Sequence, residues 1–233
     1  MKIEFFCTYP GVFDTWPIEP IGKAIPNWVR TAREDYVSNK SADNHSSHIF
    51  RCNGIGELYK QGYVVRAWHD FTVQATREQL KLQAPTEHLN KLGISIQHAD
   101  TVSKFLPHRL GSCKSIIKCN TPWHLIAPCK FLMLPVAYSD NVDFEACIGI
   151  LDPSVSTEIN VQLYWNRFGD ISKVKAGTPL CHLIPITEQT CELIVREKNE
   201  NDTRWLEKRH YIWESNFVYN IQKMKELYRK FWK

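Results

Sequence analysis

Short apolar runs separated by turn residues fill the stretch from Thr121 to Ile186. Between Ile159 and Trp165 every second residue is apolar, which predicts a strand with one buried face. Residues 128–130 are turn-like, and Asp152 with Pro153 after it marks a further turn. Four more runs, rich in aromatic and branched residues, are predicted as strands: Trp123 to Ala127, Phe131 to Tyr138, Cys147 to Leu151 and Leu180 to Ile186.

The chain before and after this stretch adds strands and a few helices. Pro26 suits the start of a helix because its missing N–H costs nothing there, and Gly62 suits the end of one. Residues 1–195 are therefore predicted as a single, mainly β domain with an irregular N-terminal arm, a sandwich or jelly-roll-like barrel with a few peripheral helices. The additional elements are strands at Met1 to Thr8, Tyr63 to Val73, Gly93 to Gln97 and Cys191 to Val195, and helices at Asn27 to Asp35 and Ile55 to Gln61.

Residues 196–233 have a different pattern. They are predicted as a charged linker, Arg196 to Thr203, followed by an amphipathic C-terminal helix, Glu214 to Lys233. From Arg204 to Lys233 there are eight basic and three acidic residues, a net charge of +5 against +4 for the whole chain. One interpretation docks this helix on its own domain, and the other uses it for self-association or for an acidic partner. The apolar stripe of the helix comprises Phe217, Ile221, Met224, Tyr228 and Phe231.

Composition places the chain among packed globular proteins. It has 233 residues, of which 43% are hydrophobic and eight are Trp. The eight Cys lack the close pairing of a zinc site or a small disulfide scaffold, so reduced thiols are expected. No signal-peptide core is recognised, and no segment approaches the roughly 20 apolar residues that span a bilayer. The protein is expected to fold in the cytoplasm of the cell that makes it.

One short motif has the residue types of a metal site. His98 and Asp100 form a His-x-Asp sequence, and a second histidine such as His182 would complete the ligand set of a non-haem iron centre. Such residues occur by chance in many chains, and the competing interpretation is a strand that ends in a polar loop. No metal and no cofactor is therefore predicted. The basic tail also lacks a recognised nucleic-acid reading motif.

Several motifs resemble an uncharacterised family of proteins encoded by tailed phages, notably those of marine bacteria. Pro26 lies two residues before Trp28, Cys52 precedes a strand that ends with Trp68 and Asp70, and a Gly-Thr-Pro sequence at 177–179 precedes an apolar strand. The segment at 147–186 is similar to the corresponding part of that family. The resemblance extends over most of the chain and implies a phage protein made in the host cytoplasm, either staying there or entering the virion.

A second, partial resemblance is to the deoxyuridine triphosphatase and deoxycytidine deaminase group. Residues 149–152 are similar to the Gly-Val-Ile-Asp turn of that group, in which the Asp orients the attacking water, and 177–182 are similar to its later Gly-x-x-x-x-Gln strand. This chain has His182 in place of the Gln and lacks the aromatic residue expected soon after Asp152. A shared strand-turn-strand architecture is the competing interpretation of the Asp152 match, because similar folds support different reactions.

The leading functional hypothesis is a non-enzymatic phage protein that binds or assembles, as a virion component or a host-interacting factor. Its expected partner is a second copy of the chain or another phage or host protein. The alternative is a nucleotide-binding or nucleotide-hydrolysing protein that uses the Asp152 turn. The candidate binding residues are Trp68, Asp70, Asp152 and His182.

Overall fold

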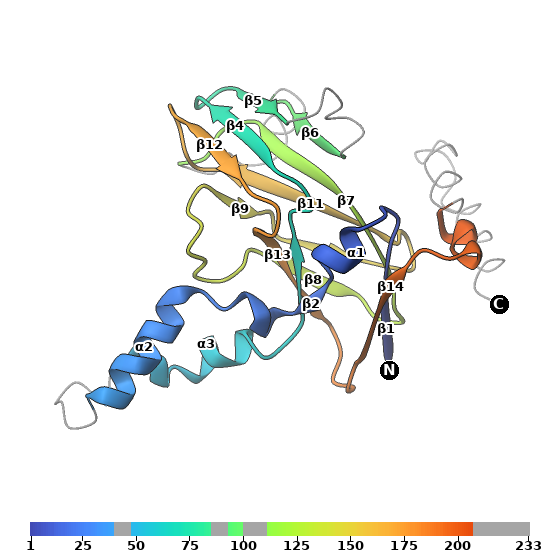
Figure 1. Cartoon of the computed structure of the whole chain (residues 1–233), viewed down its shortest axis with the longest axis horizontal. Helices are drawn as coiled ribbons and strands as arrows, with labels where there is room; N and C mark the ends of the chain where they lie inside the picture. Colours follow the sequence, from blue (N-terminus) through green and yellow to red (C-terminus); the bar gives the residue numbers. More distant parts are fainter. Residues whose placement is uncertain (40–47, 85–92, 100–110, 207–233) are drawn as a thin grey trace.

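The computed structural model describes residues 1–39, 48–84, 93–99 and 111–206, and places their strands in three sheets (Figure 1). Sheet A has the order β14 (Glu192–Glu197), β1 (Lys2–Cys7), β7 (Ile116–Ile126), β11 (Glu158–Trp165) and β9 (Phe144–Ala146), with β6 (Ile94–Gln97) also on β7. Sheet B has the order β10 (Gly149–Leu151), β8 (Phe131–Leu134), β13 (Pro179–Pro185), β3 (Tyr63–Arg66) and β2 (Glu19–Pro20). Sheet C has the order β12 (Ile171–Val174), β4 (Phe71–Ala75) and β5 (Leu80–Gln83).

The helices are few and short, so the prediction of a mainly β fold is confirmed. The α-helices are α1 (Val12–Thr15), α2 (Asn27–Ser38) and α3 (Asn53–Leu58), and the 3₁₀ turns are η1 (Ile21–Ala24), η3 (Ile49–Arg51) and η5 (Glu200–Asp202). Helices α2 and α3 lie together at one end of the molecule, and sheet C lies at the other (Figure 1). Pro26 directly precedes α2, as the sequence predicted. Within the described residues, no helix is long and apolar enough to cross a membrane.

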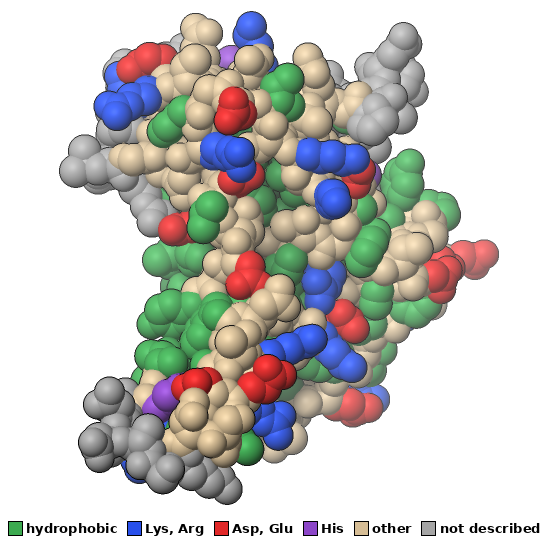
Figure 2. All heavy atoms as spheres, turned by 60° about the vertical axis from the view of Figure 1, so that its left-hand side comes forward, with side chains coloured by type: hydrophobic (Ala, Val, Ile, Leu, Met, Phe, Trp, Pro, Cys, Tyr) green, Lys and Arg blue, Asp and Glu red, His purple; other side chains and the backbone are tan. Residues whose placement is uncertain are grey.

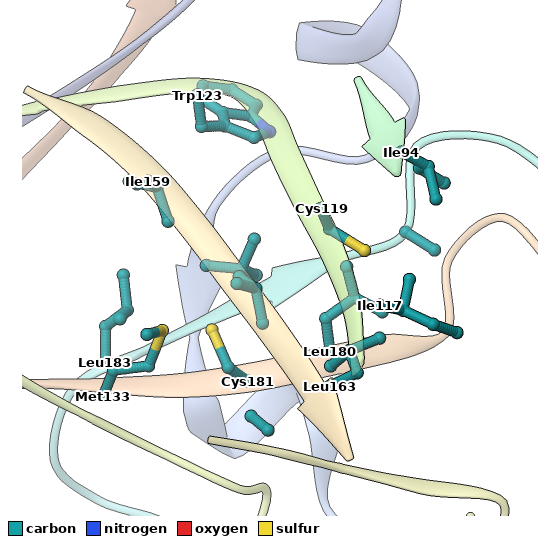
Figure 3. Close-up of a cluster of buried hydrophobic side chains, with 14 of the residues drawn as sticks. Ile94, Ile117, Cys119, Trp123, Met133, Ile159, Leu163, Leu180, Cys181 and Leu183 are labelled. Atoms are coloured by element: carbon teal, nitrogen blue, oxygen red, sulfur yellow. The ribbon is translucent and has the colours of Figure 1, made fainter. Parts of the chain in front are cut away.

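The main core lies between sheets A and B. Alternate residues of β11 are buried, as the pattern of its sequence predicted. Figure 3 shows side chains of β7 and β11, such as Trp123 and Ile159, in one cluster with Cys181 and Leu183 of β13. Among the described strands the sheets do not close into a barrel, so the fold is sandwich-like. Burial raises the pKa of the Cys119 thiol to about 12, which keeps it protonated within this core.

The turn at 128–130 carries the chain from one sheet to the other. The strand before it, β7, belongs to sheet A, and the strand after it, β8, belongs to sheet B. β8 ends at Leu134, four residues before the predicted end at Tyr138. Pro135 follows directly, and a proline has no N–H with which to continue a ladder. The predicted strand was therefore too long at this end.

The strand predicted from Tyr63 to Val73 is wrong as one element. β3 ends at Arg66 in sheet B, and β4 begins at Phe71 in sheet C. Between them, the Ala67 N–H donates to the Thr178 carbonyl at 2.8 Å, and the Ala67 carbonyl accepts from the Gly177 N–H at 2.7 Å. These bonds tie the crossing segment to the turn before β13, which no local pattern reveals.

Sheet B has a second, smaller apolar cluster on its outer face. Its buried members are Ile21, Tyr59, Val64 and Val136, and α2 and α3 add partly buried side chains to it. Gly62 has φ +87°, the left-handed conformation expected of a residue that ends a helix, although α3 itself ends at Leu58. The helices thus cover the part of the outer face nearest β3.

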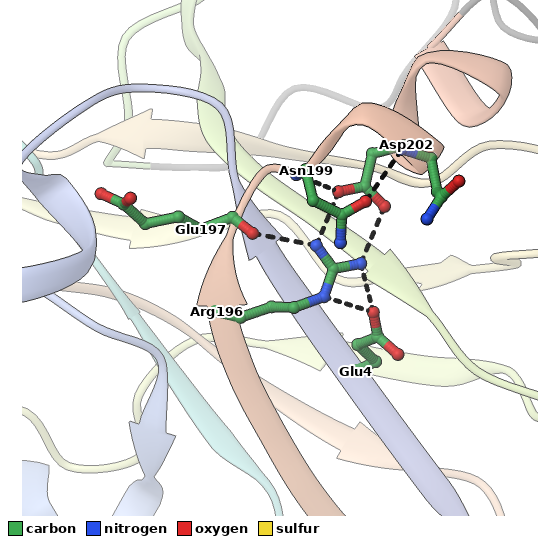
Figure 4. Close-up of polar contacts among 6 residues, drawn as sticks. Glu4, Arg196, Glu197, Asn199 and Asp202 are labelled. Carbon is green, nitrogen blue, oxygen red and sulfur yellow. Dashed lines mark hydrogen bonds and ion pairs between the residues drawn. The ribbon is translucent and has the colours of Figure 1, made fainter.

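The end of the described chain is anchored to β1. β14 pairs in parallel with β1 and extends to Glu197, two residues into the stretch predicted as a linker. Arg196 contacts the carboxylates of both Glu4 and Asp202, and it also donates to the Glu197 carbonyl (Figure 4). Residues 196–203 are therefore folded onto the domain. The predicted helix from Glu214 to Lys233, with its apolar stripe, lies outside the described residues.

Candidate functional site

Trp68 and Asp70 lie in the crossing segment between β3 and β4. The Asp70 carboxylate accepts from the Ala176 N–H at 2.8 Å and pairs with Lys173 Nζ at 2.5 Å. The hydrogen bond from Lys173 and that from Ala176 lower the pKa of Asp70. Trp68 is partly buried against the main core. Asp70 therefore joins sheet C to the turn before β13, and Trp68 packs on the main core, so a structural role accounts for the contacts of both.

Asp152 organises its own turn. Its backbone carbonyl accepts from the N–H groups of Val155 and Ser156, at 2.9 and 3.1 Å. Its carboxylate accepts from the Ser154 N–H at 3.0 Å and from the Ser154 hydroxyl, and pairs with Lys130 Nζ at 3.3 Å. Partial burial opposes ionisation, but the hydrogen bonds from Ser154 and Lys130 outweigh it and lower the pKa of Asp152. The carboxylate is ionised, with local partners already in place.

His182 is a buried histidine of β13. Its Nε2 lies 2.6 Å from the Gln61 carbonyl oxygen. A carbonyl oxygen only accepts hydrogen bonds, so Nε2 carries the proton and donates it to Gln61. Burial lowers the pKa of His182, which favours the neutral ring. His98 is exposed just after β6, and Asp100 lies outside the described residues. Within the described part of the chain there is no group of three or more His, Cys, Asp or Glu residues placed to hold a metal.

A cavity of about 410 Å³ lies beside the connection from β8 to β9, a site that the sequence did not indicate. Hydrophobic side chains gather on this face of the molecule between α2 and sheet C (Figure 2). Among the described residues that line the cavity, Glu145 carries a charge and none is Lys or Arg, which disfavours a phosphate ligand. The lining residues are Pro135, Val136, Ala137, Tyr138, Ser139, Asn141, Val142, Phe144, Glu145, Ala146, Pro179 and Leu180.

The helices hold this connection in an unusual conformation. The Trp28 indole N–H donates to the Tyr138 carbonyl at 2.8 Å, and the Asp140 carboxylate accepts from the Asn27 N–H at 2.8 Å. Tyr59 donates its hydroxyl to the Ala137 carbonyl. Tyr138 has φ +50°, which is uncommon for a residue other than glycine. The shape of the cavity therefore depends on contacts more than 75 residues apart in the chain.

A row of aliphatic side chains crosses the uncovered half of the outer face of sheet B. Ile150 of β10 lies opposite Leu132 of β8, which lies opposite Ile184 of β13. Ile148 is 71% exposed, Ile150 63% and Ile186 53%. Alternation along β8, β10 and β13 places Leu132, Ile150 and Ile184 on the face away from the main core, and Ile148 and Ile186 lie directly beyond the ends of β10 and β13. We call the set the outer patch: Leu132, Leu134, Ile148, Ile150, Ile184 and Ile186.

β10 is the last strand at its end of sheet B, and its outer edge has no partner among the described strands. In antiparallel ladders, pairs that exchange backbone hydrogen bonds alternate with pairs that do not. The Ile186 N–H donates to the Lys130 carbonyl at 2.8 Å, so the Ile184–Leu132 pair is a hydrogen-bonded one. The N–H and C=O of Leu132 therefore face β13, and the Leu132–Ile150 pair exchanges no hydrogen bonds. The N–H and C=O of Ile150 consequently point away from β8. Among the described strands none pairs with β10 on that side.

The four predicted binding residues are thus not brought together in one site. Trp68 and Asp70 share a segment, whereas Asp152 and His182 have partners of their own, and none of the four lines the cavity. The outer patch was missed because its residues are spread over three strands. Its one sequence signal was the apolar run at 147–151, which looked like an ordinary buried strand. No protein-family model and no curated protein matches the chain.

Proposed function

We propose that the chain is a non-enzymatic phage protein that acts by binding or assembly, in the particle or with a host component, and that the outer patch is its binding surface. The observation that carries this proposal is the exposure of Ile148, Ile150 and Ile186 on one sheet face, next to partly buried Leu132 and Ile184. Contiguous apolar surface of this kind marks interaction sites, since burying each such side chain contributes about 1.5–3 kcal/mol.

The contacts of the polar candidates also favour binding over catalysis. A general base or nucleophile must be within reach of a substrate, with a free lone pair or proton. The Asp152 carboxylate is bound by Lys130 and Ser154, and the ring of His182 is buried against Gln61. The nucleotide-binding alternative draws its support from the resemblance of the Asp152 turn. The phage setting rests on the resemblance of the segment at 147–186 and the motifs around it.

The test combines two measurements on the full chain. Quantitative mass spectrometry of purified phage particles, and of complexes isolated from infected cells, should find the protein in a stoichiometric assembly. Thermal unfolding with each nucleoside triphosphate and magnesium should give no rise in Tm, because a ligand of the folded state raises it. A rise that disappears in Asp152→Ala would support the nucleotide-binding alternative and overturn the proposal. A protein found in neither particles nor complexes would overturn it as well.

A further inference from the structure

The geometry points to a specific occupant of the open β10 edge. We propose that two copies of this chain join there as antiparallel strands around a twofold axis at Gly149, with Ile148 of each copy opposite Ile150 of the other. The inference rests on the proposed function and names the partner of the outer patch as a second copy. Sheet B would then continue from one copy into the next.

The backbone of β10 sets the register of this pairing. The ladder to β8 turns the N–H and C=O groups of Ile150 outward. Ile148 directly precedes β10, and the proposed pairing extends the alternation of the strand by one residue, so that the groups of Ile148 face the same way. A register centred on Gly149 places each outward residue opposite an outward residue of the other copy. It also makes two identical Ile148–Ile150 pairs, so the seam is self-complementary in both hydrogen bonds and side chains.

The charges along the strand also favour a second copy. Residues 146–151 read Ala-Cys-Ile-Gly-Ile-Leu and carry no charge, so two identical edges meet without like-charge repulsion. Exposed edges are ordinarily protected from pairing by charged residues or proline. Five other edge strands follow that rule: β14 has Glu192, Arg196 and Glu197, β2 has Glu19 and Pro20, β12 has Lys173, β5 has Lys81 and β9 has Glu145. Among the described edge strands, β6 shares with β10 the absence of charge and proline.

The side chains beside the seam extend the contact beyond the backbone. On one copy, the row from Ile150 through Leu132 to Ile184 lies on the same face. Antiparallel pairing of two β10 strands brings the two rows end to end and makes one apolar surface across the joined sheet. Ile148 and Ile150, the two most exposed members of the outer patch, lie at the centre of this surface, where burial of apolar area is greatest.

The experiment measures the mass of the full chain by light scattering over a dilution series. Wild type should be a dimer that dissociates on dilution. Ile150→Asp should raise the dissociation constant of the dimer at least about a hundredfold, because it places a charge twice in one apolar seam. Ile171→Asp is the matched control: Ile171 is also 63% exposed but lies on β12 of sheet C, and its variant should dimerise as wild type does.

A second variant tests the hydrogen bonds between the two copies, and a second measurement tests whether the two copies meet at β10. Ile150→Pro removes the outward N–H and should weaken the dimer while leaving the β8 ladder and the circular dichroism spectrum unchanged. Hydrogen exchange of the 148–151 peptide should slow as concentration rises. A monomer at every concentration overturns the inference of a β10 dimer. The proposed function is tested separately, by the measurements on phage particles and with nucleotides. A dimer that survives Ile150→Asp but is lost on deletion of Glu214 to Lys233 also overturns it.

Discussion

Arg196 holds Asp202 through two parallel hydrogen bonds, from Nη1 at 2.6 Å and from Nη2 at 2.7 Å. The same guanidinium donates from Nε to Glu4 of β1 at 2.6 Å. Asp202 is only 2% exposed, and its carboxylate also accepts from the Asn199 N–H at 2.7 Å. One side chain therefore joins the end of β14, the turn after it and the first strand of the chain.

Replacing Arg196 by Lys should destabilise the protein by about 2–4 kcal/mol. An ammonium group keeps the charge but cannot make the two-point contact, which leaves a buried carboxylate short of a partner. Urea unfolding followed by fluorescence measures the change. Glu200→Gln, on the exposed side of the same turn, is the control and should change the free energy of unfolding by less than about 0.5 kcal/mol. Equal effects of the two substitutions would contradict the role given to Arg196.

Acid should remove the contribution of Asp202. Burial opposes ionisation, but Arg196 and the Asn199 N–H lower the pKa of Asp202 below its ordinary value of 3.8. In the unfolded chain the carboxyl binds a proton near that value, so stability is present above it and is lost as pH falls towards the lower pKa of the folded state. Unfolding free energies between pH 7 and pH 2 should therefore fall less steeply below pH 4 in Asp202→Asn, which starts from a lower stability.

Alanine substitutions at two glycines measure the cost of backbone strain separately from the cost of a steric overlap. Gly177 has φ +85°, and a Cβ there would overlap the ring of Trp16. Gly169 has φ +92° and no heavy atom within 4 Å of the corresponding position. Gly169→Ala should cost about 1–2 kcal/mol for the backbone conformation alone, and Gly177→Ala about 3 kcal/mol or more. Thermal unfolding of the two variants measures the difference, and equal losses would show that Trp16 yields without cost.

His182 should make the free energy of unfolding depend on pH, at higher pH values than those at which the carboxylates titrate. Because burial lowers its pKa from 6.5, the unfolded chain binds a proton at a pH where the folded chain does not. This contribution is complete above pH 6.5 and is lost as pH falls towards the lower pKa of the folded state. His182→Gln keeps a donor for the Gln61 carbonyl without titrating. The loss of stability between pH 7 and pH 5 should be smaller in this variant than in wild type.

Local sequence determined the strands whose pattern is fixed by one buried face. β11 alternates as predicted because each of its residues at odd positions from Ile159 to Trp165 is buried. β1 and β6 were also predicted within one or two residues of their bounds. The turn at Asp152 was predicted from Pro153 and forms through hydrogen bonds within 152–156. These elements depend on neighbours in the chain, so the sequence was sufficient.

The tertiary structure decided which strands meet and which faces remain open. The break between Arg66 and Phe71 follows from hydrogen bonds to the turn at 177–178. Arg196, in the stretch that its charge predicted to be a linker, pairs with Glu4, 192 residues earlier. A period of two gives a strand two faces, but it does not say whether a helix covers either one. α2 and α3 cover the half of sheet B near Val64 and leave Ile150 exposed. Such coverage depends on contacts between distant segments, which is why only the folded chain reveals the outer patch.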